Sequence, residues 1–438
     1  MFLVKPRSRY YYFSWLLPCL LLGFLGLIFL APIHVSTSVN TIDVTAQSDR
    51  VNFPKSIDFQ MTAHDTTFRL TQATIFIQFK GIGGEHEQHQ VMTPRAGNTA
   101  TFSWHEDTTG NSFAPTGTQI SYYWLVQDGA GNTRSSAMQT FTVTDPRFTW
   151  QQATQGLLQI YWYNRPTSFG QNILHLAGDS VNRISNDLGG GLKEPISVWI
   201  YQSDEDFHNS LPAGANEWVG GIAFPALDVA SIVVNNYDDY TLIRDMPHEL
   251  THLIFHQVKS SVVQAPRWFD EGLAVYEQTY HEPAMNTRLQ RGLSQHDLLR
   301  LHNIDYAFPA DADKAYLAYA ESWNLLSYIY TTFGHTRMTI LMKDLGDPHT
   351  NFNQDLRQAL GVDEAHLENQ WHLYLHQPPT LTPGQAKATS SLAAQYAHIT
   401  ATDPTTRLLL VIGILLVILP ALGIAYLLAY QRRSQIQK

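Results

Sequence analysis

The chain is almost without cysteine and poor in charged residues, and each shortage excludes a class of protein. Only one of the 438 residues is a cysteine, so neither a disulfide framework nor a zinc module built from thiolates is expected. Charged residues make up 15% of the chain and hydrophobic residues 44%, which excludes a disordered chain and allows sizeable cores. The formal net charge of −10 lacks the basic excess that nucleic-acid binding by bulk charge needs, so we expect no nucleic-acid partner.

Two long uncharged runs lie near the two ends of the chain. Residues 14–31 form a leucine-rich run behind a basic head that carries Lys5, Arg7 and Arg9. A basic head followed by such a run predicts a signal sequence or an uncleaved signal anchor within residues 1–38.

The second run, residues 408–430, is long enough to span a bilayer even with a proline inside it. The tail that follows carries three bases and no acid, so the positive-inside rule places this tail and the N-terminal head in the cytoplasm. We therefore expect a protein of the cell membrane in which everything between the two runs lies outside the cytoplasm. Six of the 28 basic residues lie in the two cytoplasmic ends, so the outer portion contains 22 basic residues and all 38 acidic residues and is strongly acidic.

Residues 39–145 read as short strands separated by glycine-rich turns. The strand segments are rich in β-branched and aromatic residues, which favours a small β-sandwich. The stretch from Tyr122 to Asp128, followed by a Gly-Asn turn, resembles immunoglobulin-like or fibronectin-like modules of surface proteins. His86, His89 and His105 raise the alternative of a metal site here, but a solvated loop is the preferred interpretation.

From about residue 146 the pattern changes to mixed helix and strand. We expect a mainly helical segment over Gln151–Leu188, a strand over Ile196–Tyr201, and a strand pair at Ile222–Ala223 and Ala230–Val234. Helices are then predicted over 245–259, 267–280, 294–302, 314–333, 336–345, 352–360 and 363–376.

The sequence thus predicts a multidomain chain with an all-β immunoglobulin-like sandwich and an α+β domain whose C-terminal half is helical, with membrane helices at both ends. The expected division is a signal segment 1–38, a sandwich 39–145, an α+β domain 146–377, a Pro/Thr/Ser/Ala-rich stalk 378–406, a transmembrane helix 407–431 and a tail 432–438.

The segment His248-Glu249-Leu250-Thr251-His252 carries the chemistry. On a helix, His248 and His252 share one face, so both can place a ring nitrogen on one zinc ion. Glu249 is displaced from that line by one residue and can reach a water at the metal. Asp245 is a candidate N-cap, and Pro247 is tolerated only in a first turn, so the helix should begin at the motif.

A catalytic zinc site normally has a third protein ligand and an open position. Glu271 follows His252 after eighteen residues, enough for a loop and a second helix packed against the first. Glu271 is therefore the expected third ligand, with the neighbouring Asp270 as a competing candidate. A helix that carries two histidines with no metal is the alternative.

Together, His248, Glu249, His252 and Glu271 match the pattern H-E-x-x-H-x18-E of gluzincin zinc metallopeptidases. Their context resembles the peptidase MA-like family, related to the aminopeptidase N-type catalytic domain. The resemblance covers roughly residues 147–377 and includes Trp218 to Gly221 and Pro266 to Ala274. It implies that the α+β domain 146–377 is a zincin-type, gluzincin metallopeptidase-like domain.

The resemblance implies Zn²⁺ as cofactor and a peptide or protein as substrate. Glu249 would act as general base toward water and pass the proton to the leaving amine. A tyrosine should stabilise the oxyanion. Tyr319 stands at the matching place, although the Lys and Gly of the family's Tyr-x-Lys-Gly element are replaced, and Tyr316 is the local rival.

Substrate specificity departs from the aminopeptidase pattern. The family's Gly-x-Met-Glu-Asn strand uses its acid to hold a free amine, but residues 220–230 contain no Glu. We therefore favour an endopeptidase, with the edge at Gly220, Gly221 and Ile222 able to bind a peptide by strand addition. The thermolysin branch has an Asp where this chain has Val275, so no outer partner of the histidines can be named from sequence.

The leading hypothesis is a membrane-anchored, extracytoplasmic zinc metallopeptidase. The alternative is a surface adhesion or recognition protein whose sandwich binds an unknown partner and whose zinc fold is catalytically idle. Glu249 favours the peptidase, because a purely structural zinc site has no use for it.

Overall fold

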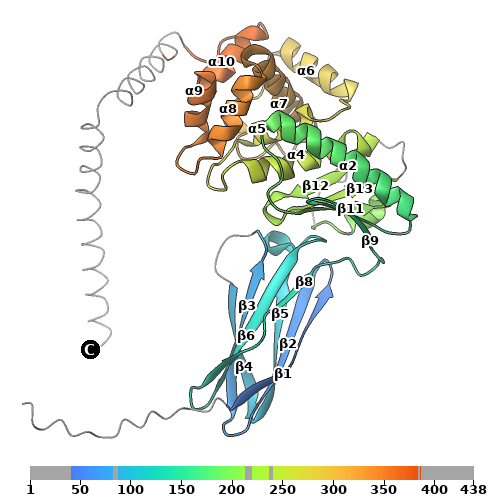
Figure 1. The fold of residues 1–438 in the computed structure, drawn as a ribbon. Coiled ribbons are helices and arrows are strands. Elements are labelled where there is room, and N and C mark those ends of the chain that lie inside the picture. The colour runs from blue at the N-terminus through green and yellow to red at the C-terminus, as the bar shows by residue number, and fades with distance from the viewer. Residues whose placement is uncertain (1–40, 82–86, 213–219, 236–239, 383–384, 386–438) are drawn as a thin grey trace, which may run out of the picture.

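The computed structural model describes residues 41–81, 87–212, 220–235, 240–382 and 385. It contains an N-terminal β domain followed by an α+β domain with a helical C-terminal half (Figure 1). The two predicted membrane runs lie outside these residues, as does most of the predicted stalk. Within the described ranges, no helix combines the length and the apolar character needed to cross a bilayer.

The N-terminal domain is built from two sheets that face each other across one core. One sheet has the strand order β1-β2-β5, and the other has the order β4-β3-β6-β7, with β8 also paired to β6. The strands are β1 (Ile42–Asn52), β2 (Ser56–Asp65), β3 (Leu70–Phe79), β4 (Glu87–Gly97), β5 (Thr99–Asp107), β6 (Gln119–Asp128), β7 (Thr133–Ser135) and β8 (Gln139–Thr142).

Alternating burial explains why these segments form a sandwich. Along β6, Ile120, Tyr122, Trp124 and Val126 are buried, while the residues between them are more exposed. Side chains alternate between the two faces of a strand, so this pattern directs one face of β6 into the core. The predicted all-β character of this domain is confirmed.

The solvated-loop interpretation of the histidines is wrong for His89. His89 lies on β4, and its ring stacks on Trp104 of β5 with centroids 4.1 Å apart. His105 also lies on β5 and contacts Asp58, with 2.6 Å between Nδ1 and Oδ1. His86 lies outside the described residues. Among the residues that are described, no metal-binding cluster occurs in this domain.

The second domain opens with a five-stranded sheet of order β12-β13-β11-β10-β9. The inner strands β10, β11 and β13 are parallel, and the two outer strands pair antiparallel to their neighbours. The strands are β9 (Gln151–Gln155), β10 (Leu158–Trp162), β11 (Ile196–Tyr201), β12 (Gly221–Phe224) and β13 (Val229–Val233). β12 forms one edge of the sheet.

The helical prediction for Gln151–Leu188 is wrong in its first part. That part forms the β9–β10 hairpin, which turns at Gly156 with φ of +60°, and only Thr167–Leu188 forms helix α2. In β10, Leu158, Ile160 and Trp162 are buried at every second position, which is the period of a strand. The short 3-10 turn η2 (Pro225–Leu227) joins β12 to β13.

Helices dominate the rest of the domain. They are α3 (Asp204–His208), α4 (Asp245–Val258), α5 (Arg267–Tyr276), α6 (Pro283–Gln295), α7 (Ala312–Phe333), α8 (His335–Leu345), α9 (Phe352–Leu360) and α10 (Glu364–Tyr374). The prediction over 294–302 is wrong. Pro283 opens α6 earlier, and His296, in the left-handed conformation, ends it.

Candidate metal centre

Helix α4 presents the motif at the junction of the sheet and the helical half. Met246, Leu250, Leu253 and Ile254 are fully buried and anchor one side of the helix in the main core. The helix begins at Asp245 as expected, but Asp245 does not cap it. Its carboxylate instead accepts two hydrogen bonds from the neighbouring Arg244 guanidinium, at 2.6 and 2.9 Å.

The two histidines and the glutamate meet at one point. His248 Nε2 lies 3.2 Å from His252 Nε2, and Glu271 Oε2 lies 3.3 and 3.5 Å from these two atoms. Three ligands of one tetrahedral zinc ion stand roughly 3.3–3.5 Å apart, given bonds of about 2.0–2.2 Å. Glu271 Oε2 is also buried without a hydrogen-bond partner, so the donor set fits a zinc ion.

Asp270 lies behind this set. Its Oδ1 is 2.8 Å from His252 Nδ1, and its Oδ2 is 2.7 Å from His256 Nε2. Burial raises the pKa of Asp270, but the contacts with the two histidines outweigh burial and hold that pKa below its ordinary value. An ionised carboxylate on Nδ1 keeps the proton on that nitrogen and leaves Nε2 for the metal. Asp270 thus orients His252, and Glu271 occupies the ligand position.

Gln278 contacts the outer ring nitrogen of His248. The Gln278 Nε2 atom lies 3.0 Å from His248 Nδ1. When Nε2 binds a metal, Nδ1 carries the ring proton, so the amide must turn its oxygen toward that nitrogen. Neither partner stands at the position of Val275, where the thermolysin branch places its aspartate.

Arg267 forms an ion pair with the second carboxylate oxygen of Glu271. Its Nη2 lies 2.6 Å from Glu271 Oε1, which leaves Oε2 as the oxygen that faces the histidines. The guanidinium also hydrogen-bonds the Tyr319 side chain. Arg267 was not among the predicted site residues, although its place four residues before Glu271 on one helix was a usable signal.

Glu249 is 6% exposed and lies against the edge strand β12. A Cβ atom on Gly221 would stand 3.0 Å from Cγ and Oε1 of Glu249, so the strand approaches this closely because residue 221 is a glycine. Burial raises the pKa of Glu249, while the positive character of His248 and His252 lowers it. The carboxylate therefore sits beside the metal ligands and beside the open strand edge.

A cavity of about 540 Å³ opens in front of these groups. Its wall includes Gly220, Gly221, His248, Glu249 and both tyrosine candidates. Ile222 is not part of that wall and packs instead against a cluster on the other side of the sheet.

The two tyrosines differ in their surroundings. Tyr316 donates its hydroxyl hydrogen to Glu282 Oε2 at 2.9 Å, whereas the ring of Tyr319 lies 6.4 Å from the ring of His248. Burial raises the pKa of Tyr319, so its hydroxyl stays protonated and can donate. Tyr319 is thus the tyrosine placed beside the metal ligands.

Replacing Asp270 with Asn should weaken zinc binding by about 10- to 100-fold, because the neutral amide no longer holds His252 in the metal-binding form. The measurement is a zinc dissociation constant from competition with a chelator. Asp179→Asn on the exposed side of α2 is the matched control and should leave the constant unchanged. An unchanged constant for Asp270→Asn would refute the role given to this carboxylate.

Residues 176–377 match the sequence model of the Peptidase MA superfamily. The match supports the resemblance to the peptidase MA-like family that the H-E-x-x-H-x18-E pattern predicted. Together with the His-His-Glu cluster, the match confirms zinc as the expected cofactor. A search of the curated proteins found no match.

Several solved structures share part of the fold at low identity. An M1 zinc metallopeptidase from Deinococcus radiodurans is 14% identical, with 78% of this chain and 96% of that chain covered and a TM-score of 0.35. Aminopeptidase A of Legionella pneumophila in complex with aspartic acid is 11% identical, with 78% and 50% covered and a TM-score of 0.35. An aminopeptidase N family protein from Idiomarina loihiensis is 10% identical, with 76% and 73% covered and a TM-score of 0.32. Likeness of this degree supports no conclusion about activity.

Proposed function

We propose that this protein is a membrane-anchored zinc endopeptidase that acts outside the cytoplasm. The observation that carries the proposal is the place of Glu249. A purely structural zinc site needs only its ligands, yet here a buried carboxylate lies beside the ligand set, the open edge of β12 and the cavity.

The residues divide the chemistry among themselves. Zinc, when bound, supplies a Lewis acid that polarises a carbonyl and lowers the pKa of water. Glu249 takes a proton from the attacking water and delivers it to the leaving amine. Tyr319 donates its hydroxyl hydrogen to the carbonyl oxygen as negative charge develops there. The edge at Gly220 and Gly221 holds the peptide backbone by strand addition, since β12 pairs only with β13 among the described strands.

The pairing of two acids in the cavity wall with an arginine supports cleavage within a peptide, rather than removal of its first residue. β12 itself contains no acid. Asp245 and Glu282 lie in the cavity wall, but the Arg244 guanidinium binds both carboxylates. A free substrate amine would have to displace that guanidinium, so the described part of the wall favours a substrate with no charged terminus at this place.

Matched peptides with free and acetylated N-termini test this preference. Because Arg244 binds Asp245 and Glu282 in the described part of the cavity wall, we expect both forms to be cut at the same internal bonds, with kcat/KM values within about threefold of each other. Mass spectrometry of the products identifies the bonds. Stepwise release of single residues from free peptides alone would overturn the endopeptidase proposal.

The uncharged runs and their basic flanks support the proposed anchoring and orientation. Carbonate extraction tests it: the anchored protein stays in the membrane pellet, whereas release into the supernatant would contradict anchoring.

A further inference from the structure

The sandwich touches the catalytic domain at the turn that follows the edge strand. Gly81, two residues after β3, has φ of +84°, and a Cβ atom there would collide with the backbone oxygen of Ala226 in η2. Phe113 of the sandwich packs on Phe224, the last residue of β12, with ring centroids 5.8 Å apart. Both contacts fall on the segment that leads from the active-site edge into the sheet.

A polar connection continues from the same turn to the metal-bearing helix. Lys80 Nζ of the sandwich lies 4.0 Å from Asp228 Oδ2, directly after η2. The other carboxylate oxygen of Asp228 accepts a hydrogen bond from Gln257 of α4 at 2.7 Å. Contacts of the Asp228 side chain therefore link the sandwich and the end of the η2 turn to the helix that carries both histidines.

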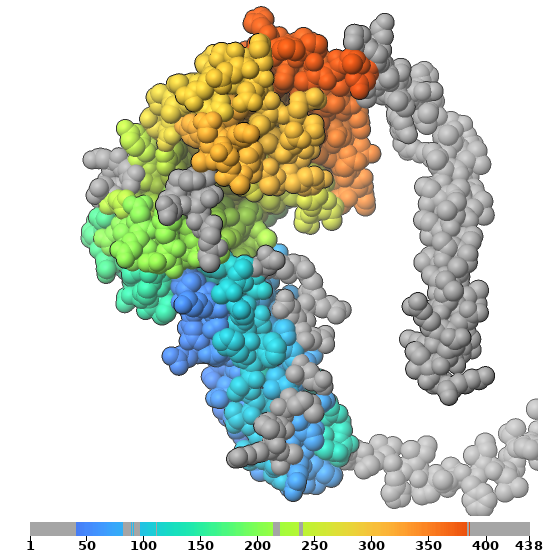
Figure 2. Space-filling view, turned by 180° about the vertical axis from the view of Figure 1, so that it is seen from behind, coloured from blue at the N-terminus to red at the C-terminus, as the bar shows by residue number. Residues whose placement is uncertain are grey.

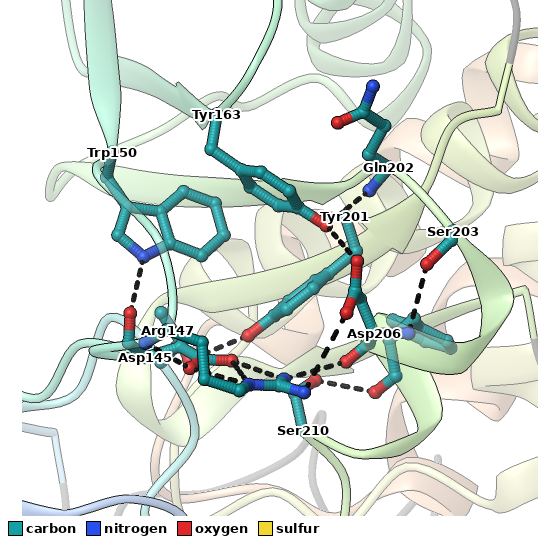
Figure 3. A network of polar contacts seen from close by, with 11 residues as sticks. Asp145, Arg147, Trp150, Tyr163, Tyr201, Gln202, Ser203, Asp206 and Ser210 are labelled. Carbon is teal, nitrogen blue, oxygen red and sulfur yellow. Dashed lines mark hydrogen bonds and ion pairs between the residues drawn. The ribbon is translucent and has the colours of Figure 1, made fainter.

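The segment between the two domains is fixed in place and is not a free linker (Figure 3). Trp150 Nε1 donates to the backbone oxygen of Asp145 at 3.0 Å, and Arg147 binds the Asp145 carboxylate. Arg147 also donates to the backbone oxygen of Asp206 at 3.0 Å, and Tyr163 donates to the Asp206 carboxylate at 2.9 Å. Arg147 thus joins the segment of residues 145–150 to α3 of the catalytic domain.

Apolar packing and a buried hydrogen bond reinforce the junction. Phe148 and Trp150 pack into the cluster formed by Tyr163, Tyr201 and Val233, and Ile222 of β12 packs against the same cluster. Thr116 of the sandwich is hydrogen-bonded to the Tyr201 hydroxyl at 2.9 Å within the protein interior. In the space-filling view, the sandwich surface meets the sheet-bearing part of the second domain end-on (Figure 2).

We propose that the sandwich is a positioning part of the peptidase: its end loops hold η2 and β12 so that the strand edge stays beside Glu249. The consequence for function rests on the proposed peptidase activity, but the mechanical coupling does not. This end of the sandwich is occupied by the chain's own catalytic domain, so its loops contact η2 and β12 and not a separate partner.

Two pairs of variants of the full-length protein test the coupling. Gly81→Ala inserts a methyl group against Ala226, and its control is Gly131→Ala. Gly131 has nearly the same φ, +87°, and only the Gln127 side chain lies near, 3.9 Å away. Phe113→Ala removes the ring that packs on Phe224. Its control is Phe68→Ala, which removes an exposed ring just before the first residue of β3.

The first readout is hydrogen exchange of peptides that cover residues 220–228. We expect exchange to be at least about tenfold faster in Gly81→Ala and Phe113→Ala and unchanged in both controls, because lost packing opens the segment locally. The second readout is kinetic. In these two variants, KM for long peptides should rise about tenfold, while kcat and the zinc content stay nearly unchanged. The variants lose binding of the peptide backbone but keep the groups that carry out the chemistry.

The outcomes separate the two proposals. Equal exchange in variants and controls would overturn the coupling, whether or not the protein cleaves peptides. Faster exchange in Gly81→Ala and Phe113→Ala, together with a wild-type protein that cleaves no peptide, would leave the coupling standing and contradict the peptidase proposal. If Gly81→Ala fails to fold, Phe113→Ala alone decides the coupling.

Discussion

Glu249→Gln should abolish peptide hydrolysis and leave zinc bound. Glutamine has nearly the same size and keeps the packing against Gly221, but its amide cannot accept the proton of the attacking water. Loss of a general base lowers kcat by roughly 100- to 10,000-fold. The measurements are kcat on a fluorogenic peptide and zinc per chain by elemental analysis.

Glu205→Gln on the surface of α3 is the matched control, because it makes the same chemical change far from the cavity. It should keep the wild-type rate and zinc content. A Glu249→Gln protein that cleaves at the wild-type rate would remove Glu249 from the reaction. Loss of zinc in this variant would instead assign the carboxylate to the ligand set.

His252→Ala should release the metal and destabilise the domain. The change removes one of three candidate ligands and leaves the carboxylates of half-buried Asp270 and buried Glu271 without their shared partner. Breaking a buried charge pair costs about 3–5 kcal/mol, so we expect a clear fall in the unfolding temperature as well as loss of stoichiometric zinc. Calorimetry with and without a chelator measures both effects.

The chelator gives this prediction its internal check. Wild type should lose stability when zinc is removed, whereas His252→Ala should respond little because it holds no zinc. His175→Ala, at an exposed position of α2, should behave as wild type. Stoichiometric, tightly held zinc in His252→Ala would place the metal elsewhere.

The ligand set could be predicted from sequence because it follows from helix geometry. Two histidines four residues apart share a face on any α-helix, and Glu271 lies on the next helix, which packs directly on the first. The helices at 352–360 and around 267 were located to within a few residues, since their apolar periodicity and caps are local features.

The partners of the ligands could not be predicted, because they depend on how α5 packs on α4. Asp270 and Glu271 are neighbours in sequence, and only the rotation of α5 decides which carboxylate faces the metal. Gln278 contacts His248 although 30 residues separate them in the chain, and no sequence spacing predicts that contact.

The β9–β10 hairpin was missed for a different reason. A short apolar run such as Leu158–Trp162 suits a buried strand or a helix equally well, and only its partner β11 decides between them. The junction of the two domains was also out of reach, because the contacts of Gly81 and Phe113 join segments more than 100 residues apart.

Digestion of a defined peptide library by the full-length protein is the most direct test of the account. We expect internal cleavages that a chelator stops, that added zinc restores and that Glu249→Gln lacks. Absence of cleavage by a protein that carries one zinc per chain would contradict the account and favour an idle zinc fold on an adhesion or recognition protein.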